Sequence, residues 1–215
     1  MASVTKFTRS AVRNQLRHIE RTIAHPANED IDASMSELNY SLAPQRGMDS
    51  YSYFQQRLSE LYVYNRADVK VMAGWIVTAP TDLVRDQYAT FFQATYNFLA
   101  DRYGEENCIQ AVVHSDESGQ PHLHYCFIPV TQDKKHGGAK VCANDVLNRA
   151  ELRNFHPALQ KYLNEHGIDA RVTSGITARQ GGNRTVRELK KERTYEHRWE
   201  HSWGDHDREY ERTRW

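Results

Sequence analysis

The chain has 215 residues and equal numbers of acidic and basic side chains, so its formal net charge at pH 7 is zero. That length suits one domain with a substantial core, and the mean hydropathy of -0.79 argues against a membrane protein. There is no apolar run long enough to span a bilayer, and the N-terminus lacks the pattern of a signal peptide. Since the three cysteines lack CxxC spacing, we expect a cytoplasmic protein with reduced thiols.

The elements expected in the first half of the chain alternate between strand and helix. β-branched and aromatic runs predict strands, and apolar residues at helical spacing predict helices. Ser10 is the expected N-cap of the first helix. In chain order we expect a strand at 3–8, a helix at 10–23, a loop at 25–47, a helix at 51–65, a strand at 69–80 and a helix at 82–103.

The second half adds a hairpin and a long helix. In chain order we expect strands at 108–115 and 122–130 joined by a turn, a weak strand at 138–143, a helix at 148–166 and a last short strand at 169–174. Because a hairpin joins the central strands, the predicted fold class is α+β, a central antiparallel β-sheet with helices packed on one side. Residues 1–180 are expected to form one domain, and residues 181–215 a charged helix or arm.

Two basic segments interrupt the neutral composition. Residues 6–21 carry five basic side chains against one acid, and residues 184–193 carry five against two. Such segments are typical of phosphate contacts, although solvated helix faces produce the same pattern. The candidate DNA-binding residues within them are Lys6, Arg9, Arg13, Arg17, Lys190 and Lys191.

The stretch HSDESGQPHLH, residues 114–124, places three histidines around one predicted hairpin. Alternate residues of a strand share a face, so His122 and His124 project together and the turn brings His114 beside them. Three neutral imidazoles are a common set of ligands for a divalent ion, and they leave positions open for water or substrate. We therefore expect a metal site, and the alternative is a surface hairpin with incidental histidines.

Two acids lie in the turn of this hairpin. Asp116 and Glu117 are candidates to orient imidazole N–H groups or to supply a fourth ligand, although ordinary turn chemistry explains them as well. We predict a catalytic role for Glu117 and leave Asp116 open. The chain has neither a P-loop nor a dinucleotide-binding glycine motif, which argues against an NTPase.

Three motifs in order resemble those of a known family. HIER (18–21), NYSL (39–42) and the histidine stretch resemble the motifs of the MobV plasmid mobilisation relaxases, also called Pre/Mob plasmid recombination proteins, which are HUH endonucleases. The resemblance implies an HUH relaxase-like fold, Mn²⁺ or Mg²⁺ as the metal, and single-stranded or hairpin origin DNA as the partner. It also implies a possible homodimer.

The resemblance further implies site-specific nicking by metal-assisted transesterification, in which the 5′ phosphate becomes attached to a histidine that matches His18. Neutral imidazole is nucleophilic at pH 7. Arg21, three residues later, would share a helix face with His18 and hold a phosphate oxygen. His25 and Tyr40 are rival nucleophiles. Tyr40 is alternatively a base-stacking platform, and Asn39 a backbone or phosphate contact.

Other functions fit the same residues. A DNA-binding initiator or repressor would use the metal site structurally, and it would be indifferent to replacement of His18. Another His₃ metal-dependent phosphoesterase, or a small β-barrel oxygenase, would use the metal for different chemistry. The helices expected at 82–103 and 148–166 disfavour a barrel.

Overall fold

The computed structural model describes residues 2–23, 28, 30–133, 135 and 137–173. Its centre is a five-stranded sheet in the order β1-β3-β5-β4-β2, in which every neighbouring pair is antiparallel. This confirms the predicted α+β class. The strands are β1 (Ala2–Thr8), β2 (Tyr40–Ser41), β3 (Lys70–Thr78), β4 (Cys108–His114) and β5 (His122–Phe127).

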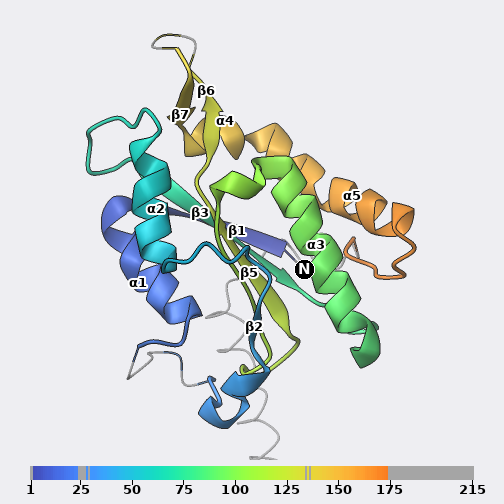
Figure 1. Ribbon diagram of the computed structural model, residues 1–215. Helices are drawn as coiled ribbons and strands as arrows, with labels where there is room; N and C mark the ends of the chain where they lie inside the picture. Colours follow the sequence, from blue (N-terminus) through green and yellow to red (C-terminus); the bar gives the residue numbers. More distant parts are fainter. Residues whose placement is uncertain (1, 24–27, 29, 134, 136, 174–215) are drawn as a thin grey trace, which may run out of the picture. The chain divides into compact units, whose positions relative to one another are not determined.

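Helices cover both faces of the sheet, so the expectation of helices on one side is wrong (Figure 1). On one face α1 (Arg9–Ile19) and α2 (Ser50–Ser59) pack on the sheet, and on the other α3 (Tyr88–Tyr103) and α5 (Arg149–Glu165) do so. The reason is that the central strands are apolar at successive positions. In β3, Met72 belongs to the core under α1 and Ala73 to the core under α3.

The smaller elements lie around this frame. They are β6 (Val130–Gln132), which pairs with β7 (Ala139–Val141), the short helix α4 (Ala143–Val146), and the 3-10 turns Ala33–Leu38, Arg85–Gln87 and Glu105–Asn107. No helix of the described ranges has the length and apolar character needed to cross a bilayer.

Several element ends differ from the predictions. The first helix ends at Ile19 rather than at 23, and Thr8 rather than Ser10 stands at its N-cap position. The helix expected at 51–65 ends at Ser59. The α-helix expected from 82 begins at Tyr88, after a 3-10 turn.

Two strand predictions also need correction. The strand expected at 122–130 divides, because β5 ends before Pro129 and β6 pairs elsewhere. The described part of 169–174 is not a strand. Instead, the side chain of Gln160 donates to the Ala170 carbonyl at 2.8 Å and accepts from the Val172 N–H at 2.8 Å, so an amide side chain satisfies this segment.

The expected arm at 181–215, which includes Lys190 and Lys191, lies outside the described residues, as does His25.

Candidate functional site

Three histidines converge at one end of the sheet, on the face that α1 covers. The register pairs His114 with His122, and His124 with Val112. The ring centroids lie 4.6 Å apart for His114 and His124, 4.9 Å for His122 and His124, and 5.5 Å for His114 and His122. The convergence expected from the hairpin is therefore confirmed. With Glu117, each residue offers one ligand atom, and these four atoms lie within 4.8 Å of one another.

The two buried histidines are held neutral. Burial lowers the pKa of His114 to about 4 and lowers the pKa of His124 well below its ordinary value. The Nε2 of His114 lies 2.9 Å from the carbonyl oxygen of Ile19. Since a carbonyl only accepts, Nε2 carries the proton and donates, which leaves Nδ1 with a lone pair facing the cluster. This is the tautomer that can ligate a metal.

His124 supplies a direct test of whether these residues fit a metal. Its side chain is buried, and its Nε2 has no hydrogen-bond partner among the described residues. A buried polar atom without a partner is costly, and a cation beside the three imidazoles would satisfy it. The histidines and Glu117 therefore fit a divalent ion.

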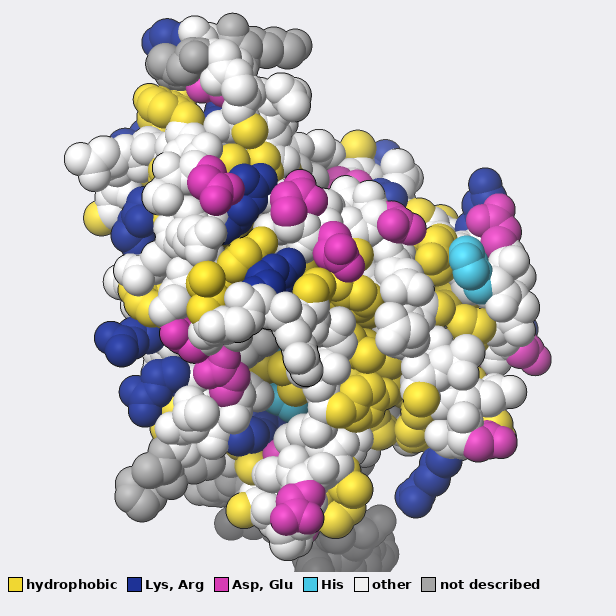
Figure 2. All heavy atoms as spheres, viewed as in Figure 1, with side chains coloured by type: hydrophobic (Ala, Val, Ile, Leu, Met, Phe, Trp, Pro, Cys, Tyr) yellow, Lys and Arg dark blue, Asp and Glu magenta, His cyan; other side chains and the backbone are white. Residues whose placement is uncertain are grey.

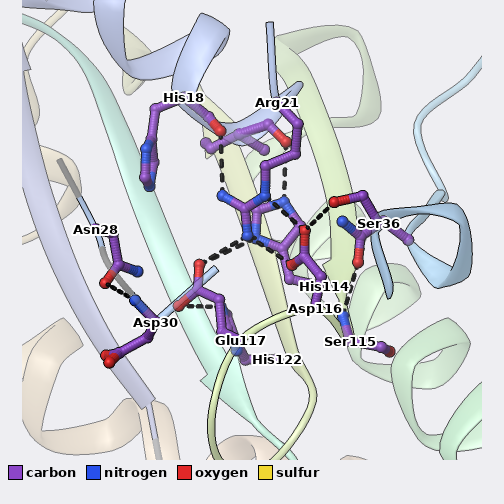
Figure 3. A network of polar contacts seen from close by, with 12 residues as sticks. His18, Arg21, Asn28, Asp30, Ser36, His114, Ser115, Asp116, Glu117 and His122 are labelled. Carbon is purple, nitrogen blue, oxygen red and sulfur yellow. Dashed lines mark hydrogen bonds and ion pairs between the residues drawn. The ribbon is translucent and has the colours of Figure 1, made fainter. Parts of the chain in front are cut away.

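Glu117 closes the cluster on the side of the turn. Its carboxylate oxygens lie 3.8 Å from Nδ1 of His114 and 3.9 Å from Nε2 of His122. The same carboxylate accepts from Nη2 of Arg21 at 2.7 Å (Figure 3). Glu117 can therefore serve as a fourth ligand or as a proton acceptor.

Arg21 does not share a helix face with His18, contrary to expectation. The helix ends at Ile19, and Arg21 adopts a left-handed backbone with φ of 57°. Its guanidinium is bidentate on Asp116, with Nε at 2.8 Å and Nη2 at 2.7 Å from the carboxylate oxygens, and Nη2 also lies 3.0 Å from Nδ1 of His114. The fork that we expected to be free for phosphate is thus already engaged with protein groups.

Asp116, whose role the sequence did not decide, connects Arg21, the 32–36 segment and the hairpin turn. Its side chain is fully buried, accepts both Arg21 bonds and accepts from the Ser36 hydroxyl at 2.9 Å. Its backbone carbonyl accepts from the Asp32 N–H at 2.8 Å. Burial alone would raise the pKa of Asp116, but the bonds from Arg21 outweigh it and hold the pKa well below its ordinary value. The carboxylate is therefore a fixed anion that ties the 32–36 segment to the hairpin.

His18 lies at the end of α1 and is half-buried. In Figure 3 its ring hangs from the helix toward the strands that carry the cluster. Burial, followed by the charge of Arg21, lowers its pKa, so the imidazole is neutral at pH 7. The charges of Glu117 and Asp116 act in the opposite direction and raise the pKa of His18, but burial and Arg21 outweigh them.

The candidate DNA-binding residues fall in different places. Arg9, Arg13 and Arg17 are exposed on α1, on the same face as the histidines. Lys6 is not brought to the site, because its ammonium donates to Asn144 and to the Leu147 carbonyl beneath the opposite face. The structure thus separates Lys6 from the arginines next to it in sequence.

The motif at 39–42 is similarly divided. The side-chain oxygen of Asn39 accepts from the Ser115 N–H at 2.8 Å, so Asn39 holds the start of the turn. Tyr40 pairs with Val113, whose side chain belongs to the core under α3. Directly opposed residues of a sheet share a face, so Tyr40 points away from the histidines.

Comparisons with known proteins agree with this geometry. The family model described as plasmid recombination enzyme matches residues 1–197. A plasmid recombination enzyme of Lactiplantibacillus plantarum is 32% identical over 197 residues, covering 88% of this chain and 52% of the relative. One of Streptococcus agalactiae is 30% identical over 199 residues, covering 89% and 38%. The chain therefore spans about half or less of the length of these curated relatives.

Solved structures give the same result. The chain superimposes with a TM-score of 0.71 and 29% identity on a MobM relaxase domain, covering 89% of this chain and 97% of that one. That structure holds the MobM domain bound to plasmid pMV158 oriT DNA with manganese. Together with the match of the family model over most of its length, this shows that the chain belongs to the plasmid recombination enzyme family, Mob_Pre.

Proposed function

We propose that this chain is the catalytic domain of a metal-dependent relaxase, which nicks one DNA strand at a plasmid origin of transfer during mobilisation or recombination. The observation that carries the proposal is the convergence of His114, Glu117, His122 and His124 within 4.8 Å, with His18 facing them from α1. The oriT DNA and manganese of the related MobM domain support the choice of substrate and metal.

The metal proposed is Mn²⁺ or Mg²⁺, held by Nδ1 of His114 and by the rings of His122 and His124. When bound, such an ion supplies positive charge that stabilises the phosphate oxygens in the transition state. The surrounding residues of the chain keep these ligands neutral. Burial does so for His114 and His124, and the Ile19 carbonyl fixes the His114 tautomer.

His18 is the proposed nucleophile. A ring nitrogen forms a bond to phosphorus while the bond from phosphorus to the 3′ oxygen breaks, and that oxygen takes up a proton to become the free 3′-hydroxyl. The 5′ phosphate stays on the histidine. Glu117, whose charge acts on His18, is the proposed acceptor of the proton that the imidazolium must lose.

Arg21 takes a different role from the free phosphate clamp that the sequence suggested. Asp116 holds its guanidinium so that Nη2 lies between His114 and Glu117. We assign to Arg21 a fixed positive charge at the edge of the cluster, which adds to the stabilisation of the reacting phosphate.

The exposed side chains of Arg9, Arg13 and Arg17 are proposed to follow the DNA backbone, and binding is then salt-dependent. The cysteines described are free thiols, which supports a place in the cytoplasm. The homodimer that the family resemblance implies stays a prediction.

The test is the intact mass of the protein after incubation with manganese and a single-stranded oligonucleotide from its own plasmid origin. We expect a covalent adduct that mild acid removes and alkali preserves, as for a phosphoramidate, and we expect His18→Ala to abolish it. His166→Ala is the matched control, because His166 is exposed at the end of α5. An acid-stable adduct that persists in His18→Ala would assign the nucleophile to a tyrosine.

The same test distinguishes the relaxase from a protein that only binds DNA. A DNA-binding initiator or repressor with a structural metal would bind the oligonucleotide without any adduct, and His18→Ala would leave that binding unchanged. The lowered pKa of His18 favours the enzyme, since a neutral half-buried imidazole is primed for attack and contributes little to binding phosphate.

A further inference from the structure

A pocket of about 480 Å³ lies beside the candidate site, over strand β4. Apolar side chains, among them Met48, Ile109 and Val112, form much of its lining, and its polar side chains include Glu20 and Gln110. Pockets of this size with apolar walls and a few converging polar groups are typical of sites for small ligands.

The pocket continues toward the histidine cluster. A neighbouring hollow of about 420 Å³ shares Glu20, Ser41 and Val112 with it, and is also lined by Arg21. The guanidinium of Arg21 in turn contacts Glu117 at 2.7 Å. Figure 2 views the molecule from the β2 edge and shows the surface hollowed near that strand. A DNA strand whose scissile phosphate lies at the histidine cluster can therefore extend along this surface into the pocket of about 480 Å³.

Glu20 and Gln110 both line the pocket and contact each other. Gln110 is 3% exposed, and its Nε2 donates to Oε1 of Glu20 at 2.9 Å. The Oε1 of Gln110 is buried and has no partner among the described residues. Glu20 is exposed, and its ionised carboxylate can only accept. A ligand that fits these groups must bring hydrogen-bond donors.

The rim of the pocket is already ordered. The guanidinium of Arg46 lies 3.9 Å from the ring centroid of Tyr53 and donates to the Glu105 carbonyl at 2.9 Å. The Tyr53 hydroxyl donates to the Glu106 carbonyl at 2.7 Å. A planar cation fixed in this way offers a stacking face or a phosphate contact at small cost in side-chain entropy.

From these observations we infer that the pocket takes one unpaired base of the bound strand, and that Glu20 and Gln110 select a base with an exocyclic amino group. Adenine, cytosine and guanine each carry such an amino donor on the edge used for pairing, whereas thymine carries only its ring N–H. The inference rests on the proposed function, because it names a further contact of the same single strand.

The test uses the whole chain with manganese and a library of randomised single strands, from which bound strands are recovered and sequenced. We expect one position to favour adenine, cytosine or guanine over thymine. In Glu20→Gln that preference should weaken about 10-fold, as for the loss of one base contact, while preferences elsewhere stay unchanged. Glu165→Gln is the matched control, since it removes an exposed acid at the far end of α5.

A second variant guards against a general charge effect. Gln110→Met keeps the volume of the buried side chain and the net charge, and it should weaken the same preference at the same position; circular dichroism checks that it folds. An unchanged profile in both variants overturns the inference, yet leaves the proposed function standing if the parent nicks DNA. A parent that neither binds nor nicks any strand overturns both.

Discussion

Two clusters of polar side chains, one on each face of the central sheet, differ in whether every polar group has a partner. On the face under α3 and α5, Trp75 donates to the Tyr103 hydroxyl, which donates to Glu151, and Arg102 pairs with the same carboxylate at 2.6 Å. Each of these groups has a protein partner. On the α1 face, His124 keeps a buried ring nitrogen with no partner among the described residues.

This difference teaches how one sheet supports both a core and a site. A network in which every polar group has a protein partner is stable without a bound ligand. In the histidine cluster a buried ring nitrogen of His124 has no partner among the described residues, and a cation bound beside the three imidazoles would satisfy it. If the two clusters differ in this respect, replacements in each should have different effects on metal binding and on stability.

The largest effect is expected from removal of two ligands. His122→Ala combined with His124→Ala should lower Mn²⁺ affinity by more than about 100-fold, since even partners outside the ligand set cost about 10–100-fold. Electron paramagnetic resonance of free Mn²⁺ measures the affinity, and circular dichroism checks the fold. His156→Ala, on the other face, serves as the control. Undiminished Mn²⁺ binding by the double variant would remove the metal site from the proposal.

The next largest effect is expected from removal of one carboxylate from each cluster, which should change the free energy of unfolding by different amounts. Asp116→Asn should lower the free energy of unfolding by about 3–5 kcal/mol, because it leaves Arg21 partly buried without its main partner. Glu151→Gln should cost less, since the side chains of Arg102 and Glu151 are 26% and 16% exposed. Urea unfolding measures both.

The same pair of variants gives a second readout. Asp116→Asn should also weaken Mn²⁺ binding, because Asp116 sets the position of Arg21 against His114 and Glu117. Glu151→Gln should leave Mn²⁺ binding unchanged. Equal behaviour of the two variants in the metal titration would show that Asp116 only supports the fold.

The smallest effect concerns pH and the face without a proposed site. Burial, followed by the charge of the N-terminus, lowers the pKa of His156 below 6.5. A group whose folded pKa is lowered stabilises the protein above its unfolded pKa, and this stability is lost as the pH falls. We expect the free energy of unfolding to decrease as the pH is lowered from about 6.5. His156→Gln should make this fall of the unfolding free energy with decreasing pH less steep, as measured by urea unfolding at several pH values. A parent slope that His156→Gln leaves intact would assign it to other groups.

Much of the site was predictable because its logic is local. His114, His122 and His124 follow the alternation of strands and a single turn, and both operate within eleven residues. The antiparallel sheet followed from the same hairpin. His18 was singled out by the resemblance of its motif to a family, and its role as nucleophile stays a prediction. In Figure 3 its ring points from α1 toward the strands that carry the cluster.

The errors have equally definite causes. Local periodicity cannot show that helices cover both faces of a sheet, so we expected helices on one face only. Helical spacing assumed that Arg21 continued α1, whereas its left-handed backbone ends the helix. β2 was hidden in a polar loop, because two residues that pair with β4 show no alternation.

The amino-acid sequence alone settles that three imidazoles share one face of a hairpin, because side-chain direction in a strand repeats every two residues. Only the folded chain decides what those imidazoles meet. The Ile19 carbonyl reaches His114 across 95 positions of sequence, and Arg21 reaches Asp116 across the same number. Such contacts depend on how α1 packs on the sheet, which is a property of the whole core and of no local pattern.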